Sequence, residues 1–422
     1  MTMTEPPKKS VWLISKYCRL PSSAISYADN FQVKGAHPAR GFSILRSLCE
    51  RGYDCTLLHA RHGSNFEKGQ RVPPREVFYV EGVRVVSLRV LSYRRVQSLA
   101  RIFGWLQFEI KLFFMKKSDF PRPDYIVASS LSLLSVLNGL VLRWRFKSKL
   151  IFEVRDVWPL VLTENGGFHP WSPFIFGLSL VEWMGYRYSD HIVATMPNLA
   201  PHVKKVLGFS REVHCIPMGI SSELLNEVRV ALPADLDGQF PKDKFIVTYV
   251  GSIGVDNALD VLFQAVRLLK DNPRIVFRIF GKGDLLSRYR AECSDLDNIF
   301  FGGPIPAGMV QSVLERSSLL YFSTHPSIVL EYGQSLNKIV DYMFSGRPIL
   351  ASHSGYQSML NEADCGYFIP ANDSDALVTT ICSLSALPDA KLDEIGSRGR
   401  NWLLENRQYD KLALQYAQLL ES

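Results

Sequence analysis

The chain has 422 residues, of which 47% are hydrophobic and 21% are charged. Because a single hydrophobic core rarely grows beyond about 250–300 residues, this length predicts two domains of roughly 200 residues each. The net charge of +7 suits an anionic ligand, an anionic membrane surface or simply a basic enzyme, and it is too small to favour a nucleic-acid-binding protein.

The seven cysteines are scattered along the chain, and none lies in a CxxC pair. This pattern argues against a disulfide framework or a zinc site and favours a reducing cytoplasm. The N-terminal apolar run is interrupted by charged residues, so we expect no cleavable signal peptide. The longest nearly uncharged stretch, 129–142, is shorter than the ~18–20 apolar residues that cross a bilayer. We therefore expect no membrane-spanning segment.

In the first half of the chain, short apolar runs alternate with helix-like segments. The runs are VWLIS (11–15), CTLLHA (55–60), YIVASS (125–130), KLIFEV (149–154), HIVATM (191–196) and EVHCIP (212–217). Such alternation predicts a parallel β-sheet with helices on both faces. We assign residues 1–215 to a first domain of this kind, because the strand pattern lapses after CIPMGI (215–220).

Polar residues that follow two of these strands are candidates for binding, since open α/β sheets bind ligands beyond the carboxyl ends of their strands. Glu153, Arg155 and Asp156 follow one strand, and His37 and Arg40 follow the first. We expect Asp156 to contact or deprotonate an acceptor hydroxyl, with Arg155 holding a phosphate or orienting Asp156. His37 and Arg40 could face donor phosphates. The alternatives are a buried salt-bridge network for the first group, and a loop histidine and a helix-start arginine for the second.

The segment SLARIFGWLQFEIKLFFMKK (98–117) combines aromatic and aliphatic residues with Arg and Lys, and it contains one acidic residue. A basic amphipathic helix of this composition can lie in the interface of an anionic membrane. A helix that faces the core of the first domain is the alternative, because apolar stripes more often pack inside a protein.

A second alternating series begins at FIVTYVG (245–251) and predicts a second α/β domain over residues 216–400. Its further runs are IVFRIFG (275–281), NIFFGG (298–303), LLYFST (319–324), PILAS (348–352) and GYFIP (366–370). Two alternating halves in tandem indicate two Rossmann-like domains. Residues 401–422 have helical spacing, and we expect this helix to return to the first domain and pack against it.

The segment STHPSIVLEYGQSLNKIVDYMFSGRPILAS (323–352) carries the most specific signal and predicts a helix over 336–345 between two buried strands. Ser335 is a candidate N-cap. The free N–H groups at Leu336, Asn337 and Lys338 would then form an anion site. Lys338 would stabilise a diphosphate leaving group, and Asp341, on nearly the same helix face, could accept hydrogen bonds from a ribose. The alternative is a capped surface helix with a Lys/Asp pair.

The order of these motifs resembles the donor-site region of the family 4 retaining glycosyltransferases. The resemblance rests on SLNKIVDYMFSGRPI, GYFIP and NDSDAL (372–377), preceded in the expected order by YVGSIG (249–254), FGKGD (280–284) and FFGGPIP (300–306). FEVRDVWPL (152–160) and VEW (181–183) resemble the bacterial subfamily that transfers fucosamine and N-acetylfucosamine in surface-polysaccharide synthesis, including O-antigen and capsule. The resemblance covers nearly the whole chain. It implies the GT-B fold, in which two Rossmann-like domains face each other across a cleft.

The resemblance also implies how a nucleotide sugar is held in the second domain. The implied donor-binding residues are Gly251, Ser252, Gly254, Lys282, Gly303, Ile305, Ser335, Leu336, Asn337, Lys338 and Asp341. Phosphate neutralisation would rest on Lys338 and Lys282, because Asp256 and Asn257 replace the family's usual Lys-Gly. Glu331 lies ten residues before Asp341, a longer spacing than the family's two glutamates have, so its contact with the sugar is left open.

The activity that the resemblance implies is a retaining transfer of a sugar, expected to be an N-acetylated amino sugar, from a UDP-sugar to a polyprenyl-diphosphate-linked saccharide. Asp156 and Lys338 are the expected catalytic residues, and a front-face displacement is the expected mechanism. The lipid acceptor predicts a cytoplasmic enzyme on the inner face of the cytoplasmic membrane, with an anionic membrane surface as a partner and no nucleic acid. A UDP-sugar epimerase of the same fold and a non-catalytic partner of another transferase are the alternatives.

We expect no cofactor and no metal requirement. The DxD strings at Asp235/Asp237, Asp295/Asp297 and Asp373/Asp375 fall in loops or helix starts, and none precedes the buried-strand turn that metal-dependent transferases use. The sequence contains neither a GxxxxGK[ST] phosphate loop nor a nucleophile elbow, which argues against kinases and hydrolases.

Overall fold

The computed structural model divides the chain into two units, each built on its own β-sheet. Unit 1 comprises Met1–Pro217 and Tyr409–Ser422, and unit 2 comprises Met218–Gln408. The residues that the structure describes are 8–21, 23–24, 37–62, 73–91, 99–116, 120–130 and 132–422. Unit 1 first ends at residue 217, where the sequence predicts 215, and the chain re-enters it at residue 409, where the sequence predicts 401.

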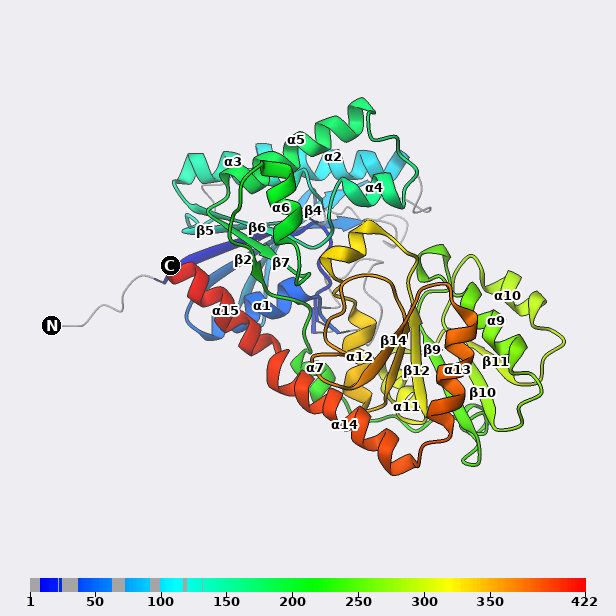
Figure 1. Cartoon of the computed structure of the whole chain (residues 1–422). Coiled ribbons are helices and arrows are strands. Elements are labelled where there is room, and N and C mark those ends of the chain that lie inside the picture. Colours follow the sequence, from blue (N-terminus) through cyan, green and yellow to red (C-terminus); the bar gives the residue numbers. More distant parts are fainter. Residues whose placement is uncertain are drawn as a thin grey trace. The chain divides into compact units, whose positions relative to one another are not determined.

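The described part of unit 1 forms an eight-stranded sheet in the order β3-β4-β2-β1-β5-β6-β7-β8 (Figure 1). The strands are β1 (Ser10–Ile14), β2 (Asp54–His62), β3 (Arg75–Val80), β4 (Val83–Val90), β5 (Tyr125–Ser129), β6 (Lys149–Val154), β7 (His191–Ala194) and β8 (His214–Cys215). Neighbouring strands pair in parallel except β3 and β4. The parallel sheet predicted from the alternating apolar runs is confirmed.

The sequence interpretation missed the antiparallel hairpin of β3 and β4. A two-residue turn joins the strands, and both turn residues have positive φ, 49° at Glu81 and 82° at Gly82. Two-residue turns of this kind match the twist of paired strands, and glycine adopts positive φ without steric cost. A glycine turn between two strand-like segments, REVFYV (75–80) and VRVVSLRV (83–90), was the signal available in the sequence.

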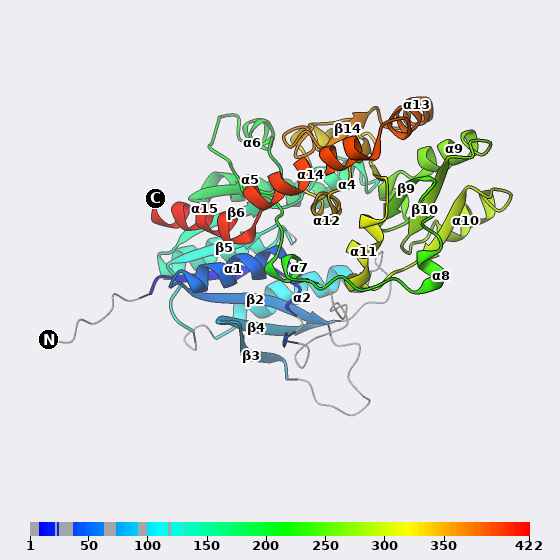
Figure 2. The ribbon, with the colours of Figure 1, turned by 90° about the horizontal axis from the view of Figure 1, so that it is seen from below.

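Helices cover both faces of the unit 1 sheet. On one face, α1 (Arg40–Glu50) and α15 (Tyr409–Glu421) lie side by side (Figure 2), and Ser47 Oγ donates a 2.6 Å hydrogen bond to Asp410 Oδ1. The predicted return of the C-terminal helix to the first domain is confirmed. On the other face lie α2 (Leu99–Phe114), α3 (Ser135–Phe146) and α5 (Pro173–Tyr188). The helices α4 (Leu160–Glu164) and α6 (Ala200–Leu207) precede α5 and follow β7, respectively.

Side chains alternate across β1 and so divide the interior of unit 1 into two cores. Val11 and Leu13 pack in the core beneath α1 and α15, whereas Trp12 and Ile14 pack in the core beneath α2 and α3. Among the helices within the described ranges, none is both long enough and apolar enough to cross a membrane. Ser98 and Lys117, the ends of the segment 98–117, lie outside the described residues.

Unit 2 contains a six-stranded parallel sheet in the order β11-β10-β9-β12-β13-β14. The strands are β9 (Phe245–Val250), β10 (Ile275–Phe280), β11 (Ile299–Gly303), β12 (Leu319–Ser323), β13 (Ile349–Ser352) and β14 (Gly366–Ile369). Its α-helices are α7 (Ser222–Leu225), α8 (Ala234–Asp237), α9 (Asp260–Leu268), α10 (Leu286–Glu292), α11 (Val310–Glu315), α12 (Asn337–Ser345), α13 (Ser374–Ser385) and α14 (Asp389–Asn406). Short 3-10 helices cover η2 (Val255–Asn257), η3 (Ala307–Met309) and η4 (Ile328–Tyr332).

Candidate functional site

The order of the strands in unit 2 identifies one point at which connections leave in opposite directions. From β9 the chain runs through β10 to β11 on one side, and from β12 it runs through β13 to β14 on the other. Open α/β sheets bind ligands beyond the carboxyl ends of their strands at such a switch point. The residues that follow β9 and β12 are therefore the first place to look for a site in unit 2.

Lys338 lies in the first turn of α12 and directs its ammonium to the loop after β9. Its Nζ donates hydrogen bonds to Asn257 Oδ1, 2.6 Å away, and to the hydroxyl of Tyr249, 3.2 Å away. The same nitrogen lies 4.8 Å from the centroid of the Tyr249 ring. Burial disfavours the charged form and lowers the pKa of Lys338 to about 8. The Lys338 side chain is thus a cation at neutral pH, and its position at the start of a helix is fixed by Asn257 and Tyr249.

The loop after β9 is shaped by the absence of a side chain at Gly251. A Cβ atom there would lie 2.9 Å from the Tyr249 hydroxyl and 3.2 Å from Lys338 Nζ. The loop is also tied to β12, because Ser323 Oγ donates a 2.7 Å hydrogen bond to the carbonyl of Asn257. These contacts join the ends of β9 and β12 and the start of α12 at the switch point.

A second glycine loop, after β10, lies against the first at backbone distance. A Cβ atom at Gly281 would meet the Gly251 carbonyl oxygen at 1.7 Å, and one at Gly283 would meet the Ile253 oxygen at 2.1 Å. The N–H of Ile253 donates to the carbonyl of Lys282 over 2.9 Å. Glycine is required at both positions because any side chain would separate the loops.

Several of the predicted donor residues are therefore neighbours at the carboxyl ends of the strands, through direct contacts or through their loops. Gly251, Ser252 and Gly254 belong to the loop that Lys338 reaches, and Lys282 to the loop packed on it. Gly303 ends β11, and its carbonyl accepts a 2.8 Å hydrogen bond from the N–H of Gly281. Ile305 follows Gly303 and packs with a hydrophobic cluster of this unit.

Asp341 lies near a carboxylate that the sequence interpretation did not consider. Loss of solvation, together with the smaller effect of the negative charge of Glu227, raises the pKa of Asp341 to about 7. The pKa of Glu227 is also raised by loss of solvation, although Arg229 opposes the shift. The ammonium of Lys338 binds Asn257 and not Asp341. These contacts therefore do not match the Lys338/Asp341 pair that the surface-helix alternative predicts. Glu227 follows α7, far from α12 in sequence, and no motif marked it.

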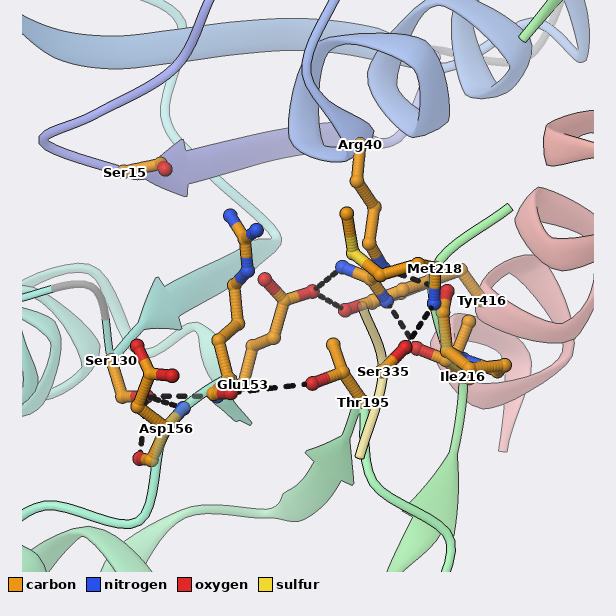
Figure 3. A network of polar contacts seen from close by, with 12 residues as sticks. Ser15, Arg40, Ser130, Glu153, Asp156, Thr195, Ile216, Met218, Ser335 and Tyr416 are labelled. Atoms are coloured by element: carbon orange, nitrogen blue, oxygen red, sulfur yellow. Dashed lines mark hydrogen bonds and ion pairs between the residues drawn. The ribbon is translucent and has the colours of Figure 1, made fainter. Parts of the chain in front are cut away.

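The N-cap predicted at Ser335 is wrong. The helix begins at Asn337, Leu336 occupies the N-cap position in an extended conformation, and no side chain among the described residues caps the helix start. Ser335 Oγ instead accepts a 2.8 Å hydrogen bond from the N–H of Met218 (Figure 3). The N–H groups of the first turn thus keep their capacity to bind an anion. Glu331 is exposed in η4, upstream of this helix.

In unit 1, the loop after β6 carries Arg155 and Asp156, and residues that follow the two neighbouring strands bind its backbone. Ser130, after β5, accepts hydrogen bonds at its Oγ from the N–H groups of Arg155, at 2.8 Å, and Asp156, at 3.4 Å. Thr195, after β7, donates to the carbonyl of Arg155 over 3.4 Å. Asp156 is exposed, although the surrounding protein removes enough water to raise the pKa of its carboxyl, against the nearby charge of Arg155.

Glu153 and Arg40 form a buried network rather than an open one. Figure 3 shows the guanidinium of Arg40 and the hydroxyl of Tyr416 meeting at one carboxylate oxygen of Glu153, and both donate to this Oε2 atom. Arg40 also donates to the carbonyls of Ile216, at 2.6 Å, and Pro217, at 3.0 Å. Burial would raise the pKa of Glu153, but the Arg40 and Arg155 charges outweigh it and hold the pKa below its usual value.

These contacts favour the buried salt-bridge alternative for Glu153. The side chain of Arg40 is buried inside unit 1 and makes its hydrogen bonds to Glu153, Ile216 and Pro217. The network joins α1, β6 and α15 to the segment that leaves β8. His37 is half-buried just before α1, and its carbonyl accepts a hydrogen bond from Arg19.

Comparison with known families shows what kind of protein carries these sites. Residues 244–386 match the family model described as glycosyl transferases group 1, and residues 42–224 match the model described as glycosyltransferase family 4. The group 1 match falls in unit 2, and the family 4 match falls chiefly in unit 1. The protein is a glycosyltransferase.

Solved structures similar to this glycosyltransferase show that its fold is GT-B. Sucrose-phosphate synthase from Thermosynechococcus elongatus is 18% identical, with a TM-score of 0.70 and 98% of each chain covered. HepE of Anabaena, solved in complex with UDP-glucose, is 12% identical, with a TM-score of 0.62 and coverage of 98% of this chain and 99% of that one. An E. coli structure described as trehalose-6-phosphate bound with UDP-2-fluoro glucose is 11% identical, with a TM-score of 0.72 and the same coverage. The predicted fold class is confirmed.

The DxD strings of the glycosyltransferase are engaged in structural contacts. Asp237 pairs with Arg316 at 2.5 Å, and Asp295 pairs with Arg267 at 2.8 Å. Asp373 caps α13 by accepting a 2.8 Å hydrogen bond from the N–H of Ala376. Within the part of the chain that the structure describes, no group of three or more His, Cys, Asp or Glu side chains could hold a metal ion.

Proposed function

We propose that this glycosyltransferase moves an N-acetylated amino sugar from a UDP-sugar to a lipid-linked saccharide with retention of configuration. The observation that carries the donor half of the proposal is the ammonium of Lys338, held by Asn257 and Tyr249 at the switch point of unit 2. A preorganised cation beside the open N–H groups of a helix start suits a diphosphate leaving group.

The proposed donor pose follows the residues around Lys338. The diphosphate lies at the start of α12 and against the loop that begins at Gly251. Asp341 accepts hydrogen bonds from the ribose hydroxyls, and the base lies near the backbone of Gly303 and Ile305. The complexes of HepE with UDP-glucose and of the E. coli protein with UDP-2-fluoro glucose support this class of donor, since both proteins share the fold of this chain.

The proposed reaction is a front-face displacement. The bond between the anomeric carbon and the diphosphate breaks, and the acceptor hydroxyl forms the new glycosidic bond on the same face of the sugar. The proton leaves the hydroxyl for Asp156 or for a diphosphate oxygen. The exposed carboxylate of Asp156, set by Ser130 and Thr195 at the end of β6, supports its role as the acceptor contact.

We further propose that the acceptor is a polyprenyl-diphosphate-linked saccharide, extended during surface-polysaccharide synthesis such as that of O-antigen lipopolysaccharide. The enzyme then works on the cytoplasmic side of the membrane as a peripheral protein. The support is the resemblance to amino-sugar transferases in FEVRDVWPL and VEW, together with exposed apolar side chains on unit 1.

The deciding experiment incubates the purified chain with a panel of UDP-sugars and a membrane lipid extract, and identifies the product by mass spectrometry. Transfer to a lipid-linked saccharide supports the proposal. Interconversion of two UDP-sugars without an acceptor would instead identify an epimerase, and absence of any turnover with every donor would favour a non-catalytic partner. Because Lys338 supplies positive charge at the diphosphate, we expect transfer to continue in EDTA. Complete loss that magnesium or manganese restores would contradict this expectation.

A further inference from the structure

Three neighbouring helices of unit 1 turn large apolar side chains to solvent. In Figure 1, α2, α3 and α5 lie together on the face of the sheet opposite α1 and α15. The most exposed side chains are Trp171 (88%), Trp144 (85%), Phe114 (78%) and Phe176 (72%). Soluble proteins seldom expose large apolar groups side by side unless a partner covers them. We call this face, with Trp171 just before α5, the α2–α3–α5 surface.

The exposed side chains follow helical periodicity on each helix. They are Phe103, Leu106, Ile110, Phe113 and Phe114 on α2, Leu137, Val141 and Trp144 on α3, and Phe174, Phe176 and Leu180 on α5. The spacings i, i+3, i+7 on α2 and i, i+4, i+7 on α3 define continuous outer stripes. These stripes are distinct from the buried faces of the same helices, to which Phe108, Leu112 and Leu142 belong. The buried face of α2 matches the core-facing alternative for the segment 98–117, and the exposed apolar face is the one that the membrane-facing alternative requires.

The only acidic residue of α2 lies on the buried face. Glu109 accepts hydrogen bonds from Ser132 Oγ, at 3.0 Å, Ser135 Oγ, at 2.7 Å, and Asn138 Nδ2, at 2.7 Å. Trp105 is also partly turned inward, and its indole N–H donates a 2.8 Å hydrogen bond to the Tyr17 hydroxyl. A substitution of Trp105 would thus disturb the interior, and the outer face must be tested at other residues.

The charge of the α2–α3–α5 surface is basic. No acidic side chain is exposed on these three helices in the described residues, because Glu109 and Glu182 are buried and α3 contains no acid. Arg145, Lys147 and Arg187 are exposed at the ends of α3 and α5. Beside these ends, a hollow of about 420 Å³ is lined by Arg143, Arg187 and Arg211, with Asp190 bound to Arg143.

We propose that the α2–α3–α5 surface docks on a bilayer leaflet that contains anionic phospholipid. Apolar stripes flanked by basic residues match the two layers of such a leaflet, acyl chains and negative headgroups. Exposed tryptophans suit the boundary between them. The inference deepens the proposed function, on which it rests for its purpose, since a lipid-linked acceptor is reached from the same leaflet.

The positions of the two tryptophans imply contact along the whole helix layer. α3 and α5 connect parallel strands, so both helices run opposite to the strands and parallel to each other. Trp171 lies before the N-terminus of α5, and Trp144 lies near the C-terminus of α3. A helix of 16 residues such as α5 spans about 24 Å. The two side chains therefore mark opposite ends of the surface, and the helices lie along the membrane plane.

The test measures binding of the full chain to vesicles of phosphatidylcholine with and without phosphatidylglycerol. We expect the wild-type protein to co-sediment with the anionic vesicles, to be released by high salt, and to show a blue shift of tryptophan emission. The double variant Trp144→Ser/Trp171→Ser should lower the vesicle partition coefficient by at least about tenfold. Arg145→Ala and Lys147→Ala should each lower it by about fivefold, which corresponds to the ~1 kcal/mol that a basic residue contributes near such a surface.

Leu414→Ser is the matched control for the tryptophan variants, because Leu414 is an exposed apolar residue on α15, on the opposite face of the same sheet. It should leave vesicle binding unchanged. Circular dichroism establishes that each variant is folded, and UDP binding should stay unchanged, since the proposed UDP site belongs to unit 2. Equal binding of wild type and Trp144→Ser/Trp171→Ser would overturn the proposal, as would equal binding to vesicles with and without phosphatidylglycerol. Self-association without lipid that the double variant abolishes would also overturn it, because the surface would then pair two copies of the chain.

The docking inference and the proposed function fail separately. Vesicle binding without sugar transfer would leave the docking surface in place and contradict the proposed activity. Transfer to a short, water-soluble acceptor without vesicle binding would support the proposed activity and contradict the docking surface. If both hold, the tryptophan double variant should raise KM for the membrane-bound acceptor and leave KM for the water-soluble acceptor unchanged.

Discussion

Lys338 and Asn257 are joined by a hydrogen bond of 2.6 Å between Nζ and Oδ1, across 81 residues of sequence. The bond fixes a partly buried ammonium before any ligand binds, so little reorganisation is needed when negative charge develops on a leaving group. Tyr249 supports the same cation with its hydroxyl and its ring.

We expect Lys338→Ala to lower turnover by about a hundred- to a thousandfold, because loss of one preorganised transition-state contact has an effect of that size. Steady-state kinetics of UDP release measure the effect. Lys270→Ala is the control, since Lys270 is an exposed lysine just after α9 in the same unit. Turnover of Lys338→Ala within about twofold of the wild type would contradict the donor site.

Donor binding should depend on pH through Lys338. Its pKa is lowered to about 8, and a bound diphosphate raises it by favouring the charged form. Binding therefore takes up a proton above pH 8, and UDP affinity should fall by up to about tenfold per pH unit there while it stays steady near neutral pH. Calorimetric titration with UDP measures the profile. The same decline in Lys338→Ala would show that another group titrates.

Asp341→Asn should make unit 2 more stable and bind UDP more weakly. The pKa of Asp341 is raised to about 7 by burial and then by Glu227, so the folded state holds the proton more tightly than the unfolded state, where the value is near 3.8. The free energy of unfolding therefore falls progressively as pH rises from about 4 to about 7, because Asp341 ionises more readily in the unfolded state. Above about pH 7 this loss of stability is constant.

The variant cannot ionise at this position and should gain a free energy of unfolding of the order of 4 kcal/mol over the wild type above pH 7, and about none near pH 4. Denaturant unfolding of both proteins across this range measures the difference. Asp297→Asn, an exposed aspartate of the same unit, should show no comparable rise. A difference that is independent of pH would rule out the raised pKa as its cause.

Arg40→Ala should destabilise unit 1 and spare the proposed donor site. The substitution leaves the buried carboxylate of Glu153 without its ion-pair partner and removes two bonds to backbone carbonyls. Breaking a buried pair on one side costs about 3–5 kcal/mol, whereas an exposed pair is worth about 0–1 kcal/mol. Denaturant unfolding should show this contrast with Arg288→Ala, whose pair with Asp260 is exposed. A loss of UDP binding equal to the loss of stability would show that the two units do not respond separately.

The strands of both sheets could largely be predicted because most of them are buried on both faces and appear as continuous apolar runs. The hairpin of β3 and β4 is the exception, since the sequence interpretation named neither strand. β3 lies at the edge of the sheet, where the apolar run Val77–Val80 is only alternately buried, and β4 is interrupted by Arg84 and Arg89. The N-cap at Ser335 also failed, because the choice between capping α12 and bonding Met218 depends on a residue 117 positions earlier.

At the candidate site, Lys338 could be predicted from its place near a helix start in a recognisable order of motifs. Its partners could not, since Asn257 and Tyr249 lie 81 and 89 residues away and carry no motif that marks them as partners. Glu227 likewise comes near Asp341 only through the fold. Sequence spacing describes neighbours along one helix, whereas the charges that set a pKa come from segments that only folding brings together.

The position of α15 has a consequence for the synthesis of the chain. Tyr409, Leu412, Ala413, Tyr416 and Leu420 complete the core beneath α1, although the rest of that core is encoded before residue 218. A ribosome releases the chain from its N-terminus, and domains commonly fold in that order. Here the unit that is started first is finished last, after all of unit 2 has emerged. Until then, Phe42, Leu45 and their neighbours on α1 lack the helix that covers them. We therefore expect a nascent chain stalled before residue 409 to aggregate more readily than the full chain.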